Sequence, residues 1–125
     1  MKIATHHVPG TFRDRWIEYC NTNNITVKLV NVYDTTDIIN QLKECDGFMW
    51  RWHHVDYRDQ LSTRQLILFL ETFGPSVFPN SNTSWHYDDK VGQKYLLEPV
   101  NVPFVKSHIF YTKNEALSWV EKVRL

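Results

Sequence analysis

The 125-residue chain has few glycines and few cysteines, and these shortages exclude several kinds of site. Its four glycines are too scattered for either glycine-rich phosphate-binding loop, GxGxxG or GxxxxGK[ST]. Two cysteines, Cys20 and Cys45, cannot build a disulfide framework or a CxxC motif. A reducing compartment is the default for such a chain, so we expect the protein to be cytoplasmic.

The chain also lacks an excess of either charge and lacks a long apolar run. Fourteen Lys and Arg against fourteen Asp and Glu give a formal net charge of zero, whereas nucleic-acid and anionic membrane surfaces attract a basic excess. The longest aliphatic run, residues 66–70, is far shorter than the roughly 20 residues of a membrane span. We therefore expect no nucleic-acid partner and no membrane partner.

Apolar residues are present at ordinary globular abundance, 42%, and their spacing predicts secondary structure. Strand patterns cover residues 2–7, 25–32, 47–52 and 76–79, and helical patterns cover 11–23, 34–45, 56–73 and about 85–98. Strands that alternate with helices predict an α/β fold: an open, mainly parallel, Rossmann-like sheet with helices on both faces.

Two of these strands carry further information. The segment from Ile25 to Val32 is β-branched and nearly continuous, which is typical of a strand buried on both faces. The third strand alternates large aromatic residues with polar ones, and we expect Trp50 and Trp52 to be buried.

We predict two domains, an α/β domain over residues 1–98 that ends in a linker helix, and a shorter unit over 99–125. The shorter unit has a strand pattern at 103–111, a capping box formed by Thr112 and Glu115, and a helix pattern at 115–123. That strand and helix lack sheet partners within the sequence. Uncovered edges and apolar faces recruit other chains, so we expect this segment to pack on another copy of the chain or to fold back.

Polar groups follow the first and third predicted strands. In an open parallel sheet, ligands bind beyond the carboxyl ends of the strands, so His6, His7, Arg51 and His53 are candidate substrate-binding residues that form one anion-attracting pocket. The favoured alternative is that the histidines are loop residues, with His7 or His53 hydrogen-bonded in the core. A metal site from the two His-His pairs is disfavoured because adjacent residues on a strand point to opposite faces. The partner of Arg51 is Asp56, Asp59 or a substrate carboxylate.

The segment Asp88-Asp89-Lys90 opens the fourth predicted helix. Acidic residues suit the positive end of a helix dipole, which explains Asp88 and Asp89 without any function. The dipole does not explain Lys90, a cation at the same end.

Residues 78–118 resemble the opening of the ATP-grasp module in the ATP-grasp ligase superfamily, in its glutathione-synthetase-like or RimK-like branch. The resemblance rests on these features in order: Pro79-Asn80, a Ser/Thr-rich loop, Asp89-Lys90, Leu96-Leu97, Pro103 and Glu115-Ala116-Leu117. It implies that residues 1–98 are the pre-ATP-grasp domain and that 99–125 start an incomplete nucleotide-binding module.

The resemblance also implies a function. The complete enzyme would be an ATP-dependent carboxylate–amine or carboxylate–thiol ligase that uses ATP and Mg²⁺ and takes small-molecule carboxylate and amine substrates. Lys90 would contact nucleotide phosphates, and this chain would add one wall of the acceptor-substrate site with no catalytic residue of its own. The alternative is a self-contained flavodoxin-like module that binds a small ligand or a protein and has no ATP chemistry.

Overall fold

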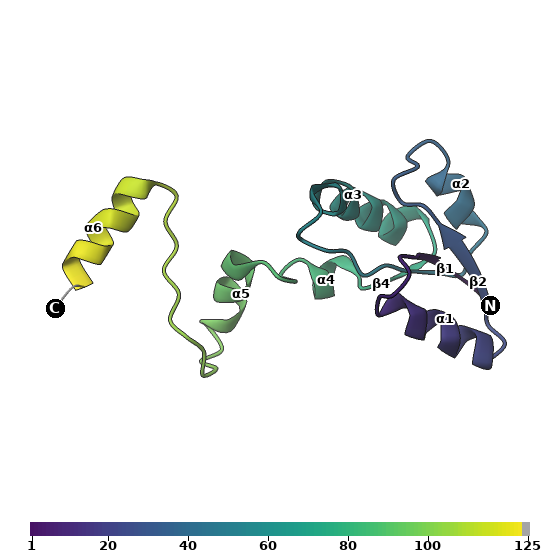
Figure 1. Ribbon diagram of the computed structural model, residues 1–125, viewed down its shortest axis with the longest axis horizontal. Helices are drawn as coiled ribbons and strands as arrows, with labels where there is room; N and C mark the ends of the chain where they lie inside the picture. The colour runs from purple at the N-terminus through teal and green to yellow at the C-terminus, as the bar shows by residue number, and fades with distance from the viewer. Residues whose placement is uncertain (124–125) are drawn as a thin grey trace. The chain divides into compact units, whose positions relative to one another are not determined.

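The computed structural model describes residues 1–123, in two compact units that divide between Trp85 and His86. We treat each unit by itself (Figure 1). The predicted domain boundary after residue 98 is a separate claim and stays a prediction. Residues 124 and 125 of the predicted second domain lie outside the described residues.

The first unit is built on a sheet of four parallel strands (Figure 1). These are β1 (Lys2–His6), β2 (Thr26–Val30), β3 (Gly47–Met49) and β4 (Ser76–Phe78), in the spatial order β2-β1-β3-β4. β1 pairs with both β2 and β3, and β4 pairs with β3. The predicted parallel α/β sheet is therefore confirmed.

Helices cover both faces of this sheet, as the alternating pattern predicted (Figure 1). Helix α1 (Arg13–Thr22) lies on one face, and α2 (Ile38–Lys43) and α3 (Tyr57–Phe73) lie on the other. Asp56 caps α3 by accepting a hydrogen bond from the Arg58 amide. The fold is Rossmann-like.

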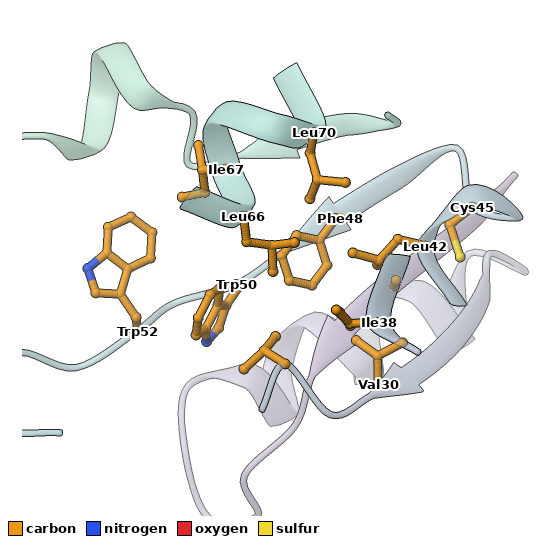
Figure 2. Packing of buried hydrophobic residues seen from close by; sticks show 12 residues of the cluster. Val30, Ile38, Leu42, Cys45, Phe48, Trp50, Trp52, Leu66, Ile67 and Leu70 are labelled. Atoms are coloured by element: carbon orange, nitrogen blue, oxygen red, sulfur yellow. The ribbon is translucent and has the colours of Figure 1, made fainter. Parts of the chain in front are cut away.

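The hydrophobic core fills the space between the sheet and helices α2 and α3. Phe48 and Trp50 lie between Leu42 of α2 and the apolar face of α3, which presents Leu66 and Leu70 (Figure 2). Trp50 is 1% exposed and Trp52 is 6% exposed, so their predicted burial is confirmed. The strand itself ends earlier than predicted, at Met49, although the Trp50 amide still donates to the Phe78 carbonyl at 3.1 Å.

The prediction that the second strand is buried on both faces is wrong. β2 lies at an edge of the sheet, where of its five residues only Val30 is buried and Leu29 is 56% exposed. A β-branched run indicates an extended backbone. It does not determine which strands lie on either side, because strand order depends on pairing between distant segments.

The predicted helix over 85–98 is also wrong in its start. The chain forms the short helix α4 (Ser81–Ser84), capped by Asn80, and then α5 (Lys90–Leu97), capped by Asp89. Asp88, between them, has a φ of +55°, a left-handed conformation that interrupts the helical path. The expected helix therefore starts at Lys90, after the Asp89 cap, and α4 lies wholly before the expected range.

The predicted strand over 103–111 is wrong. Residues 102–110 have no regular secondary structure. A strand forms only where a neighbouring segment supplies its hydrogen bonds, and no strand among residues 1–123 pairs with this segment. The capping box is confirmed: the Thr112 amide donates to Glu115 Oε2 at 3.1 Å and the Glu115 amide donates to Thr112 Oγ1 at 3.3 Å.

The last helix, α6 (Lys113–Val123), has no buried residue. Leu117, Val120 and Val123 on its apolar face are each at least 40% exposed, as expected for a face without a cover. Which molecule covers that face stays a prediction. None of the helices in residues 1–123 has the length and apolar character needed to cross a lipid bilayer.

Candidate functional site

The strand order places a topological switch point between β1 and β3. From β1 the chain moves outward to β2, and it then returns past β1 to form β3 and β4. The loops after β1 and β3 therefore diverge at the carboxyl edge of the sheet, which is where open α/β sheets bind ligands. His6 ends β1, and residues 50–54 follow β3 directly.

A buried arginine lies at this edge. Arg13, the first residue of α1, is 2% exposed. Its Nε and Nη2 atoms donate to the carbonyl oxygen of Arg51 at 3.1 and 2.5 Å, and its Nη1 is buried without a hydrogen-bond partner. Burial lowers the pKa of Arg13, and the charge of Asp59 partly offsets this effect. A buried guanidinium that bonds only a neutral carbonyl is an expensive arrangement.

A buried carboxylate holds the same loop from its other end. Asp59 of α3, also 2% exposed, accepts hydrogen bonds from the Tyr33 hydroxyl and the His53 amide, both at 2.6 Å. Burial, followed by the bond to Asp59, raises the pKa of Tyr33. The loop after β3 is thus fixed by Arg13 at the Arg51 carbonyl and by Asp59 at the His53 amide.

The Arg58–Asp56 ion pair lies beside Tyr33, which donates to Asp59. The Arg58 guanidinium is 4.4 Å from the centre of the Tyr33 ring and donates to both oxygens of Asp56, at 3.0 and 2.7 Å. These bonds lower the pKa of Asp56 to about 2. Asp56, one predicted partner of Arg51, is therefore engaged by Arg58, and Asp59, the other, is engaged by Tyr33 and His53.

His6 and His7 occupy different sides of the edge. His6 is buried: its Nδ1 lies 3.2 Å from the Val30 carbonyl oxygen, its ring contacts Tyr33 and Trp50, and burial lowers its pKa. The alternative interpretation placed His7 or His53 in the core, whereas the buried histidine is His6.

His7 instead pairs with α1. Its Nε2 lies 2.6 Å from Asp14 Oδ1, and this hydrogen bond lowers the pKa of Asp14. Beside the pair is a shallow cavity of about 380 Å³, whose other lining residues are Ile17, Glu18, Asn21 and Thr22. The cavity includes none of the other three predicted binding residues, so the single continuous pocket stays a prediction.

Arg51 is exposed, and its guanidinium lies 5.6 Å from the centre of the Phe12 ring. Arg13 holds the backbone of this residue by donating to its carbonyl oxygen. The sequence pattern did not single out Arg13, although a signal was available. Residues 13, 16 and 20 share one helical face, so Arg13 lies in line with the buried Cys20.

Lys90 belongs to the second unit and is described separately. It is the first residue of α5, and Asp89 caps the helix by accepting from the amides of Val91 and Gly92 at 2.8 and 2.9 Å. Its Nζ lies 3.7 Å from Asp88 and donates to Gln93 at 3.1 Å. With 79% of its side chain exposed, Lys90 is available to a ligand.

The described residues offer neither a cluster of metal ligands nor an exposed thiol. Residues 1–123 contain no group of three or more His, Cys, Asp or Glu side chains placed to hold a metal ion. Both cysteines are buried, and burial raises the pKa of Cys45. Comparison of the chain with protein-family models, curated proteins and solved structures gave no match.

Proposed function

We propose that this chain is the acceptor-substrate part of an ATP-dependent carboxylate–amine or carboxylate–thiol ligase. The observation that carries the proposal is the carboxyl edge between β1 and β3, where Arg13 of α1 meets the loop that carries Arg51. Part-buried hydrogen bonds from Arg13 to the Arg51 carbonyl and from the His53 amide to Asp59 hold this loop. The resemblance of residues 78–118 to ATP-grasp ligases supplies the reaction class. We place the protein in the cytoplasm, where two free cysteines are stable.

The residues at this edge would bind and orient an acid. Arg51 is exposed and carries a fixed positive charge, so it attracts a carboxylate. Arg13 donates to the Arg51 carbonyl and the His53 amide donates to Asp59. These hydrogen bonds fix the backbone of residues 51 and 53, so little loop ordering remains when a ligand binds. His53, two residues after Arg51 in the same loop, is a further candidate contact.

We expect the described residues to supply only part of a MgATP site. Lys90 is the single phosphate-binding candidate that the resemblance supplies, and an exposed charge contributes about 1 kcal/mol. A site with millimolar affinity needs about 4 kcal/mol. ATP and Mg²⁺ would therefore be held mainly by other parts of the complete enzyme, which would use them to activate the acid as an acyl phosphate.

The test is an assay of the protein made from its complete reading frame. ADP should form from MgATP only when a carboxylate and an amine or thiol are both present. Lys90→Ala should lower this activity at least tenfold, whereas Lys113→Ala, at the first position of α6, should not. Failure of every acid and amine pair to stimulate ADP formation would contradict the proposal.

A second candidate is a self-contained flavodoxin-like module that binds a small ligand or a protein. It is favoured by the first unit, which has its own sheet and a core drawn from residues 4–70. A reading frame that stops after Leu125, together with ligand binding that is independent of ATP, would support this module. The exposed apolar face of α6 would then serve as a contact between copies of the chain.

A further inference from the structure

The first turn of α1 and the loop after β3 bring two positive charges to one point. The buried Arg13 guanidinium bonds the Arg51 carbonyl, and the exposed Arg51 guanidinium lies over Phe12, the residue before Arg13. The amino end of α1 adds the positive end of its helix dipole. Nη1 of Arg13 is a buried donor without an acceptor, which marks this cationic site as incomplete.

Each carboxylate near the site accepts hydrogen bonds from donors other than Arg13. Those donors are His7 and Gly10 for Asp14, Arg58 for Asp56, and Tyr33 and His53 for Asp59. Nη1 of Arg13 therefore has no acceptor among the described residues. A carboxylate satisfies a guanidinium with two parallel hydrogen bonds.

An exposed aromatic cluster adjoins the cationic site. We call Phe12, Trp16 and Phe78 the aromatic wall. Phe12 and Trp16 lie with ring centres 5.6 Å apart, and Trp16 and Phe78 lie 6.4 Å apart. Phe12 is 47% exposed and Phe78 is 58% exposed, although they come from segments far apart in the sequence. Exposed aromatic residues gathered beside a charge are typical of binding surfaces.

We propose that Arg51, Arg13 and the aromatic wall bind an organic acid with a flat apolar body, for which an aromatic carboxylate is the simplest case. The carboxylate pairs with Arg51, and its ring packs on Phe12 and Phe78. Arg13 bonds the carbonyl of Arg51, which fixes the backbone that carries the Arg51 guanidinium. That this acid is the one activated by the ligase rests on the proposed function. The binding itself does not.

The test is an NMR titration of the full 125-residue chain with sodium benzoate, sodium acetate and benzylamine. Benzoate should bind at least tenfold more tightly than acetate, because acetate has the charge without the ring. Benzylamine has the ring with the opposite charge and should not bind. The shifted signals should belong to residues 12–16, 51 and 78.

Variants separate the two parts of the site. Arg51→Gln should weaken benzoate at least fivefold, and it should fold normally because Arg13 bonds the backbone of this residue. Phe12→Leu should reduce benzoate to the affinity of acetate. The controls are Arg15→Gln, an exposed arginine on the same helix, and Phe73→Leu, an exposed phenylalanine on α3. Both controls should bind benzoate as the unmodified chain does.

Equal binding of benzoate and acetate, binding of benzylamine, or equal losses in Arg51→Gln and Arg15→Gln would each overturn the proposal. These results are distinct from a failure of the ligase assignment. Benzoate binding at residues 12–16 and 51 without any ATP-dependent activity would keep this site and reject the ligase. Activity on acids that never shift these residues would keep the ligase and reject this site.

Discussion

Replacing Asp59 by Asn tests whether the loop after β3 is held by a buried charge. The Asp59 carboxylate accepts from the Tyr33 hydroxyl with one oxygen and from the His53 amide with the other, and it is 2% exposed. An Asn side chain keeps one acceptor and turns a donor toward the second partner. One of the two donors, Tyr33 or His53, is then left without an acceptor.

The magnitude follows from these contacts. Losing a hydrogen bond to a charged group costs about 1.5–3 kcal/mol, and leaving a buried polar group unpaired costs about 1–3 kcal/mol. We expect Asp59→Asn to lower the free energy of unfolding by about 3–5 kcal/mol. Tyr33→Phe removes only the hydroxyl donor and should cost about 1–2 kcal/mol.

The assay is urea unfolding followed by far-UV circular dichroism, with Asp34→Asn as the control. Asp34 is exposed, so its isosteric change should stay within about 0.5 kcal/mol. In the double variant the two losses should be less than additive, because both changes break the same hydrogen bond. A loss below about 1 kcal/mol for Asp59→Asn, or strict additivity, would refute the role given to Asp59.

Three further results are expected. Because burial lowers the pKa of His6, the folded state binds fewer protons than the unfolded state just below pH 6.5, so stability should fall there as the pH drops. His6→Gln should flatten this part of the curve in pH-dependent urea unfolding, and an unchanged slope would exclude His6 as the cause. Calorimetric titration of the 125-residue chain with MgATP should show no binding below millimolar concentration, and micromolar affinity would mean that the phosphate site is complete within it. Leu117→Glu on α6 should abolish any self-association seen by sedimentation velocity, whereas persistence of the oligomer would remove α6 from the contact.

The order of strands and helices in the first unit was predictable because it depends on local spacing. The alternation of apolar residues placed β1, β3 and α3 close to their observed positions and predicted that Trp50 and Trp52 are buried. The edge position of β2 was not predictable in the same way. It depends on the pairing of β1 with β3 across more than 40 residues.

The C-terminal errors have a different cause. Residues 102–110 have strand-like composition, but strand propensity without a paired neighbour does not produce a strand. The expected helix over 85–98 starts late, at Lys90, because Asp89 caps α5 there. The helix that Asn80 caps, α4, lies before the expected range. A polar residue with cap chemistry within a helical pattern was the available warning.

The candidate site was predicted by position better than by residue. The rule for open α/β sheets directed attention to the ends of β1 and β3, and the side chains that fix the loop there are Arg13 and Asp59. Apolar periodicity does not detect a buried arginine, because the pattern treats every charged residue as exposed. Asp59 was considered only as a partner for Arg51, whereas it binds Tyr33 and His53.

The most direct test of the central claim is a crystal structure of the chain grown with sodium benzoate. The account predicts one benzoate at the carboxyl edge between β1 and β3, with its carboxylate within hydrogen-bond distance of the Arg51 or Arg13 guanidinium and its ring on Phe12. Benzoate in the cavity beside His7 and Asp14, or on the second unit alone, would contradict the account.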